Sequence, residues 1–384
     1  MGRTLLLFLT LTTFYTSMTC VHIPYIYRVN IMSTGLTLNN SNNTPSSLSE
    51  VFKKMEPGEA IIKQEIKEEI PFSFEDNTKK KVNPDIKISR IQFPVPDYIR
   101  GIYISNGTAL SHKKLYQFIE KSKLFNINTM VVDVQKKMVP RLHVEMLKNN
   151  GIYPVARVVV FLGGLKTKYP EKEYIDSILA LIETAAHQGF EEVQLDYIRY
   201  ADDKELLKIP LKEKYHVINT ILAAARATAD RLNIRLSADV FGRITLNNHD
   251  HIGQKLENFS HYVDSLYPML YPSHYTGDYN RISQPYNTIK EGVENSINRC
   301  GNVKIIAYIQ GFNLKTEQSG KSLVDYIKDQ MSAVEDANGA GWIIWNAKND
   351  YETSYKAIAK IDMRETKVIS GQDTKDTKED HVRD

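Results

Sequence analysis

A short apolar stretch of the chain ends in residues that could carry out acid–base chemistry. Residues 191–200 read EEVQLDYIRY, and Val193 and Leu195 alternate with polar positions before Asp196. Such alternation is typical of a β-strand. A carboxylate at the end of an apolar strand has to be hydrogen-bonded or used, because a buried unpaired acid loses its solvation. The stretch therefore makes Asp196 a candidate catalytic carboxylate.

Two other apolar stretches contain an aspartate in the same kind of position. Residues 127–135 (INTMVVDVQ) contain Asp133, and residues 234–242 (IRLSADVFG) contain Asp239. Successive side chains of a strand point to opposite faces, so each aspartate lies on the face opposite its apolar neighbours. If the apolar faces pack against helices, the three aspartates point the other way and converge. The same parity places Tyr197 on the apolar face of its strand.

The elements that would position these residues repeat eight times between two polar tails. Each repeat has a β-branched or aromatic run that is followed, in most cases, by helical periodicity. The predicted strands are residues 101–105, 127–135, 152–161, 191–200, 234–242, 265–273, 303–312 and 341–347. This pattern predicts an α/β fold, the (β/α)8 TIM barrel, whose sites lie at the carboxyl ends of the strands. A doubly wound open sheet is the alternative, but no glycine-rich dinucleotide turn follows the first strand.

Arginine, aromatic and amide side chains near the strand ends would surround the aspartates. Aromatic rings can pack against the apolar face of a sugar, while amides and carboxylates bind its hydroxyl groups. We therefore expect a carbohydrate site. The candidate substrate-binding residues are Asp133, Arg157, Arg199, Tyr271, His274, Tyr308, Gln310, Trp345 and Asn346. The alternatives are salt bridges that only hold loops and aromatic rings that only fill the core.

A series of motifs over residues 98–352 resembles a known family. In chain order they are RGIYIS, VVDVQ, YPVARVVVF, EVQLDYIRY, SADVFG, DSLYPMLYPSHY, YIQGF and GWIIWNAKNDY. This series is similar to a bacterial family of glycoside hydrolase domains, TIM barrels related to amylase- and chitinase-like barrels. The resemblance implies a glycan substrate and gives Asp196 the role of nucleophile or stabilising carboxylate. The loop after Asp133, QKKMVPRL, is shorter than the family pattern.

A paired-carboxylate mechanism needs one acid that stays protonated, and we assign this role to Asp239. Asp133, Tyr271 and His274 are alternatives in supporting roles. A separation of about 5–5.5 Å between the carboxyl groups would predict retention of anomeric configuration, and about 6.5–9.5 Å would predict inversion. The sequence leaves both outcomes open.

Two other classes of function remain open. A carbohydrate-binding barrel without activity, a pseudoenzyme at the cell surface, would keep the aromatic residues but lack a correctly spaced acid pair. A metal-dependent hydrolase would need histidines at strand ends, and the close pair His249 and His251 in NNHDHIG suits a capping loop better. We therefore expect no metal and no other cofactor. The net charge of +3, from 49 basic and 46 acidic residues, does not indicate a nucleic-acid partner.

The amino-terminal residues have the layout of a secretory signal. In MGRTLLLFLTLTTFYTSMTC, Arg3 precedes an apolar run that is too short to span a bilayer. We expect an exported protein that is periplasmic, membrane-anchored or at the cell surface, with the leader or a lipidated Cys20 as the anchor. The predicted segments are a signal peptide or lipoprotein leader (1–20), a low-complexity linker (21–97), the barrel (98–363) and a disordered tail (364–384).

Overall fold

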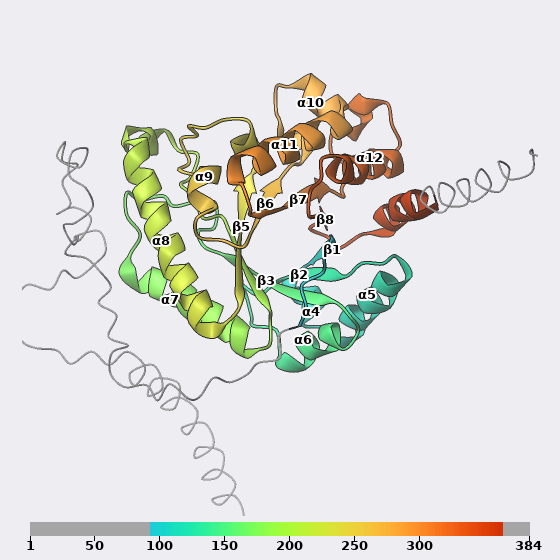
Figure 1. The fold of residues 1–384 in the computed structure, drawn as a ribbon, viewed down its shortest axis with the longest axis horizontal. Coiled ribbons are helices and arrows are strands. Elements are labelled where there is room, and N and C mark those ends of the chain that lie inside the picture. The colour runs from blue at the N-terminus through green and yellow to red at the C-terminus, as the bar shows by residue number, and fades with distance from the viewer. Residues whose placement is uncertain (1–92, 364–384) are drawn as a thin grey trace, which may run out of the picture. The chain divides into compact units, whose positions relative to one another are not determined.

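Eight parallel strands close into a barrel in the computed structural model, which describes residues 93–363 (Figure 1). The strands are β1 (Ile99–Ile104), β2 (Thr129–Asp133), β3 (Tyr153–Val159), β4 (Glu192–Asp196), β5 (Arg235–Phe241), β6 (Ser265–Met269), β7 (Lys304–Gln310) and β8 (Gly341–Trp345). Each strand pairs with the next, and β1 also pairs with β8. The predicted TIM barrel is confirmed. The predictions for the leader, most of the linker and the carboxyl-terminal tail concern residues outside the described range.

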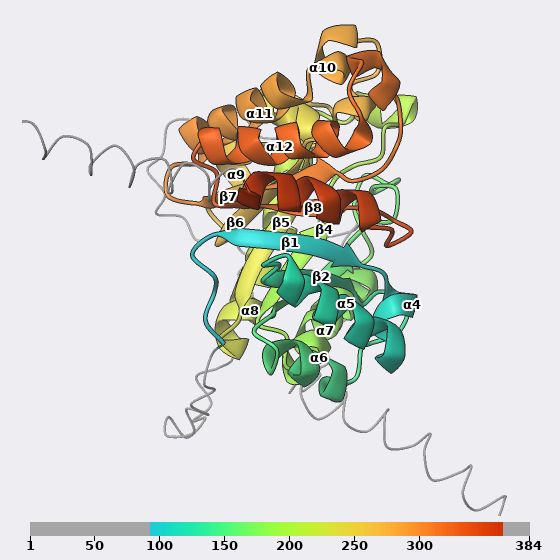
Figure 2. The ribbon, with the colours of Figure 1, turned by 90° about the vertical axis from the view of Figure 1, so that its right-hand side faces the viewer.

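Helices cover the outside of the strands (Figure 2). They are α4 (Asn106–Ala109), α5 (His112–Leu124), α6 (Arg141–Lys148), α7 (Lys172–His187), α8 (Leu211–Leu232), α9 (Leu256–Phe259), α10 (Tyr279–Ser283), α11 (Pro285–Cys300) and α12 (Leu323–Asp336). A further helix runs over residues 352–363. The connection from β5 to β6 departs from the regular repeat, because its only helical elements are α9 and the 3-10 helix Gly242–Thr245. Across residues 93–363, none of the helices combines the length and the apolarity needed to cross a bilayer.

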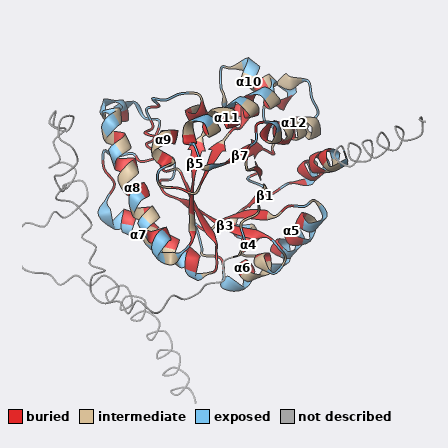
Figure 3. Cartoon of the chain, viewed as in Figure 1, coloured by how far each residue is buried: buried red, intermediate tan, exposed pale blue. Residues whose placement is uncertain are grey.

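The apolar residues of the strands form two separate layers. Val193 and Leu195 of β4 are buried in the layer between strands and helices, whereas Val131 of β2 and Val155 of β3 belong to the cluster inside the barrel. Figure 3 shows the outer boundary of the second layer, with buried residues on the helix faces turned toward the strands and exposed residues on the outer faces. The alternation predicted for the strands is therefore confirmed.

The inward-facing residues of β4 are polar, and each accepts a hydrogen bond from a side chain of another strand. Glu192, nearest the amino end, accepts hydrogen bonds from Tyr267 Oη at 3.0 Å and from Tyr153 Oη at 3.3 Å. Gln194, one level higher, accepts a hydrogen bond from Tyr308 Oη at 2.8 Å. Buried polar groups of this kind need partners, because an unpaired one carries the full cost of desolvation. The third inward-facing polar residue of β4 is Asp196, at the carboxyl end of the strand.

The barrel interior is also filled from its amino end. Phe93 and Val95, which precede β1 and lie in the segment predicted as linker, pack against the inner apolar cluster. Ala340, just before β8, packs against the same cluster. The folded unit therefore includes residues on the amino-terminal side of the predicted boundary at residue 98.

Strand β4 ends at Asp196, four residues earlier than predicted. Tyr197 has a φ of 54°, in the left-handed region that a non-glycine residue seldom adopts. The side-chain alternation of the strand stops at this residue, and Tyr197 lines a cavity at the barrel mouth instead of joining the helix layer. The parity prediction for Tyr197 is wrong because parity holds only while the backbone stays extended.

Candidate active site

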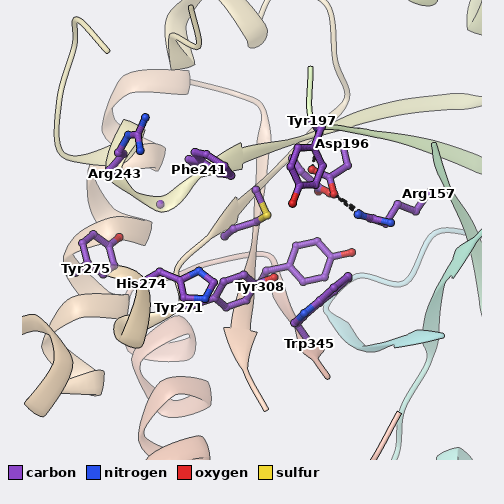
Figure 4. Close-up of a pocket in the computed structure, with 13 residues that line it drawn as sticks. Arg157, Asp196, Tyr197, Phe241, Arg243, Tyr271, His274, Tyr275, Tyr308 and Trp345 are labelled. Carbon is purple, nitrogen blue, oxygen red and sulfur yellow. Dashed lines mark hydrogen bonds and ion pairs between the residues drawn. The ribbon is translucent and has the colours of Figure 1, made fainter. Parts of the chain in front are cut away.

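A cavity of about 290 Å³ lies at the carboxyl ends of the strands (Figure 4). The charged residues that line it are Arg157, Asp196, Asp239 and Arg243. Its aromatic lining comes from Tyr197, Phe241, Tyr271, Tyr275, Tyr308 and Trp345, and Gly242, Met269 and His274 complete it. Acidic groups at the bottom and rings around the sides are a combination that can bind a sugar and act on it.

Asp196 is held in place from two sides. Arg157 donates from Nε to Asp196 Oδ2 at 2.9 Å and from Nη2 to the same oxygen at 2.5 Å. The backbone N–H of Tyr197 donates to Asp196 Oδ1 at 2.6 Å, which the left-handed turn at that residue allows. Asp196 is 2% exposed. The ion pair and the backbone donor together fix the orientation of a carboxylate that also faces the cavity.

Asp239 lies beside Asp196 on the neighbouring strand. The register pairs Leu195 of β4 with Ala238 of β5, so the next residue of each strand is one of the two aspartates. Adjacent strands are about 4.8 Å apart. Asp239 is 1% exposed, and its Oδ1 is buried without a hydrogen-bond partner. Burial and the negative charge of Asp196 raise the pKa of Asp239 well above its usual value, although the Arg157 cation opposes this.

Arg157 connects Asp196 to the third aspartate. Its Nη1 donates to Asp133 Oδ2 at 3.2 Å, and the hydroxyl of Tyr103 donates to the same oxygen at 3.2 Å. Burial opposes the charge of Arg157, but Asp196, Asp239 and Asp133 together raise its pKa, so the guanidinium remains charged. The mouth therefore has a cation shared between two carboxylates, and the third carboxyl group, Asp239, stands apart.

Aromatic rings form the wall opposite the acids. Trp345 lies 4.0 Å from Tyr103 and 6.0 Å from Tyr308 between ring centroids. On the β6 side, Tyr271 meets His274 edge to face at 5.1 Å, and burial together with the Lys315 cation lowers the pKa of His274. A neutral imidazole and several rings suit contact with the apolar face of a sugar.

Arg243 fastens together the loops that follow β4 and β5. It donates from Nη2 to Asp202 Oδ1 at 2.8 Å and from Nε to Asp250 Oδ2 at 2.8 Å. Its guanidinium lies 5.4 Å from the ring centroid of Phe241, and Arg199 lies 4.3 Å from the same ring. Phe241 thus lies close to two guanidinium groups at the edge of the cavity.

Not all predicted site residues line the cavity. The side chains of Arg157, Asp196, Asp239, Tyr271, His274, Tyr308 and Trp345 do. Arg199 is buried and donates to the carbonyl of Tyr200 at 2.7 Å. Gln310 accepts from the backbone N–H of Ser273 at 3.1 Å, and Asn346 donates to the carbonyl of Gly311 at 2.9 Å. These three side chains hold the loops around the mouth, and Asp133 lies behind Arg157.

Several cavity residues were not predicted from the sequence. Phe241 lies two positions after Asp239 on the same strand, so parity could have placed it inside the barrel. Met269 follows Tyr267 on β6 with the same spacing. The side chain of Tyr197 could not have been placed in this way, because its position depends on the left-handed backbone that ends β4.

The histidine pair after β5 does not form a metal centre with neighbouring ligands. His251 Nε2 lies 2.9 Å from Asp202 Oδ1, and the backbone N–H of His249 donates to Asn247 Oδ1 at 2.9 Å. Within residues 93–363, no group of three or more His, Cys, Asp or Glu side chains is arranged to hold a metal ion.

Solved structures with a similar fold include glycoside hydrolase barrels. The endo-1,4-β-mannanase from Rhizomucor miehei aligns with 71% of this chain and 97% of its own, at 11% identity and a TM-score of 0.53. The glycoside hydrolase domain of PgaB (BpsB) from Bordetella bronchiseptica aligns with 68% of this chain and 98% of its own, at 11% identity and a TM-score of 0.51. At this identity the likeness shows the fold alone.

A family model gives the more specific comparison. None of the curated proteins matches this chain. Residues 166–351 match the family described as "Putative glycosyl hydrolase domain", which confirms the resemblance seen in the sequence motifs. The matched segment contains strands β4 to β8, with Asp196 at the end of the first of them and Asp239 on the next. Over residues 166–351, a little under half of the chain, the barrel is therefore similar to that family.

Proposed function

We propose that the protein is a glycoside hydrolase in which Asp196 is the nucleophile and Asp239 the acid and base. The observation that carries this proposal is the pairing of two unlike carboxyl groups on neighbouring strands. Asp196 is oriented as a carboxylate by Arg157, whereas Asp239 is buried with a free oxygen and a raised pKa. Two acids whose surroundings separate their protonation states are the usual basis for assigning acid and nucleophile.

The reaction would proceed in two displacements. In the first, Asp239 donates its proton to the glycosidic oxygen while an oxygen of Asp196 attacks the anomeric carbon, and the aglycone leaves as an alcohol. In the second, Asp239 takes a proton from water, and that water attacks the anomeric carbon and releases Asp196. The first step leaves Asp239 as a carboxylate and Asp196 as an ester, and the second step returns both groups to their starting states.

The charge of Asp196 would switch the role of Asp239 between the two steps. That charge is one of the causes that raise the pKa of Asp239 in the free protein. Once Asp196 is bound to the sugar as an ester, it is neutral and no longer raises the pKa of Asp239. The same group can therefore donate a proton in the first step and accept one in the second.

The register of β4 and β5 favours retention of anomeric configuration. Side chains at the same level of adjacent strands lie close together, and an inverting pair needs about 6.5–9.5 Å between its carboxyl groups to admit a water. Asp196 and Asp239 occupy such adjacent positions, which suits the roughly 5–5.5 Å of a retaining pair.

A glycoside panel tests the proposal. Purified protein should hydrolyse at least one member of a set of nitrophenyl glycosides and cell-wall glycans, and NMR of the first product should show the anomer of the substrate. Asp196→Asn and Asp239→Asn should both fold and lose that activity. Binding of a glycan without hydrolysis by the unmodified protein would instead support the carbohydrate-binding alternative.

A further inference from the structure

Asp133 accepts three hydrogen bonds from the protein. Its Oδ2 accepts from Arg157 Nη1 and from the hydroxyl of Tyr103, each at 3.2 Å. Its Oδ1 accepts from the backbone N–H of Gln135 at 3.0 Å, and Gln135 in turn accepts from the N–H of Val159 on β3. Asp133 does not line the cavity. Asp133 is therefore held mainly by protein donors, behind the residues that line the cavity.

Arg157 depends on two carboxylates for its position. The planar guanidinium directs Nε and Nη2 at Asp196 and Nη1 at Asp133, and five donors in a fixed fork allow this division. The group also lies 5.3 Å from the ring centroid of Trp345 and 5.8 Å from that of Tyr103. Since Arg157 is 7% exposed, little water is available to replace a lost partner.

One of these two partners would lose its charge during the proposed reaction. Asp196 becomes a neutral ester in the glycosyl intermediate, and a buried guanidinium without a counter-charge is strongly disfavoured. Asp133 takes no part in bond formation and keeps its charge. It is therefore the partner that can hold Arg157 while Asp196 carries the sugar.

We propose that Asp133 is a positioning residue that keeps Arg157 in place beside Asp196 through both steps of the reaction. It also orients Tyr103, and through the ring contact of Tyr103 with Trp345 it supports the aromatic wall. This positioning role takes the place of the substrate-binding role that the sequence suggested for Asp133. The inference rests on the proposed function, because it assigns Asp196 as the residue that becomes esterified.

Asp133→Asn tests the proposal, with Asp264→Asn as the matched control. Asp264 also accepts from an arginine, Arg226 Nη1 at 3.0 Å, and from a backbone N–H, that of Leu236 at 2.8 Å, but it immediately precedes β6 at the amino end of the barrel. Both variants should lose a similar amount of thermal stability. Only Asp133→Asn should lower kcat, by about tenfold or more, with KM changed by less than about threefold.

A double-mutant cycle with Arg157→Lys tests whether Asp133→Asn lowers kcat through its contact with Arg157. If Asp133 acts through Arg157, the losses in kcat from the two substitutions should not multiply, because the second removes an interaction that is already broken. Losses that multiply would overturn the proposal. A rise in KM with unchanged kcat in Asp133→Asn would also overturn it and would restore direct contact with the sugar.

An NMR measurement decides the question without any activity. In protein labelled with 15N-arginine, the Nη protons of Arg157 should exchange with water faster in Asp133→Asn than in the unmodified protein, and Asp264→Asn should leave them unchanged. Unchanged exchange in Asp133→Asn would overturn the positioning role. Absence of glycoside hydrolysis by the unmodified protein would contradict the proposed function alone, and the exchange rates would still test the contact between Asp133 and Arg157.

Discussion

The rings of Trp345 and Tyr103 pack against each other in a tilted arrangement, with 4.0 Å between their centroids and 34° between their planes. Trp345 is one of two tryptophans in the chain, and the other, Trp342, lies on the same strand with its side chain buried in the helix layer. Only Trp345 lines the cavity. The two tryptophans therefore offer a matched pair of substitutions for testing sugar binding.

Trp345→Ala should weaken the binding of a bound oligosaccharide by about tenfold, because a ring stacked on a sugar contributes roughly 1 kcal/mol or more. Trp342→Phe should lower thermal stability and leave the affinity unchanged. It also makes Trp345 the sole tryptophan, so its fluorescence should respond when a sugar binds. Equal losses of affinity in the two variants would contradict the assignment of Trp345 to the binding wall.

Asp196→Asn should abolish turnover while preserving the fold. The amide cannot attack the anomeric carbon, and loss of a nucleophile commonly costs about 10⁴-fold or more in kcat. The buried Arg157 would keep one charged partner, Asp133, so the melting temperature should change by only a few degrees. Steady-state rates and thermal unfolding of the purified variant test both expectations. A variant that is clearly destabilised yet active would show that Asp196 serves only as an ion-pair anchor.

Asp239 should make stability depend on pH in an unusual direction. Its pKa in the folded protein is raised, so between the unfolded value, about 3.9, and the folded value the folded state holds a proton that the unfolded state releases. The stability that this group contributes is present at low pH and is lost as the pH rises through that window. Asp239→Asn cannot titrate, so it should gain stability relative to the unmodified protein by up to about 1.4 kcal/mol per pH unit there.

Denaturant unfolding at a series of pH values measures this difference. The free energy of unfolding of Asp239→Asn minus that of the unmodified protein should increase above about pH 4. It should become constant once Asp239 is ionised in the folded protein. The variant should also be inactive, since Asp239 is the proposed proton donor. A stability difference that does not vary with pH would show that the carboxyl group titrates normally.

Gly242 lines the cavity at a point where a side chain does not fit. A Cβ there would lie 2.6 Å from the carbonyl oxygen of Met269 and 2.6 Å from the hydroxyl of Tyr275. Gly242→Ala should therefore displace the β6 side of the mouth, lower the free energy of unfolding by about 1–3 kcal/mol and reduce activity. Gly107→Ala, where a Cβ meets no atom within 4 Å, is the control and should change neither. If Gly242→Ala kept both its stability and its activity, the β6 side of the mouth would have to move without cost.

The sequence was sufficient for the fold and for the direction of the three acids. Eight strand and helix repeats predict the barrel, and parity within a strand places Asp133, Asp196 and Asp239 inside it, because both depend on local periodicity. The sequence could not show that Asp133 and Asp196 share Arg157 or that Oδ1 of Asp239 is buried without a hydrogen-bond partner. Those contacts depend on the register between strands, which local patterns do not encode. Tyr197 shows a further limit, since one residue with positive φ ended the pattern on which parity relies.

The contacts of Arg243 bear on how this barrel could be recombined with others. Arg243, in the loop after β5, binds Asp202 in the loop after β4, and His251 of the second loop lies 2.9 Å from the same carboxylate, so two side chains of one loop depend on one residue of the other. Exchange of either loop alone with that of another barrel would remove the contacts of Asp202 with Arg243 and His251, which are made between the two loops. Recombination that alters substrate preference should therefore transfer residues 197–255 as one cassette, and chimaeras with a crossover inside that segment should be recovered less often in folded form.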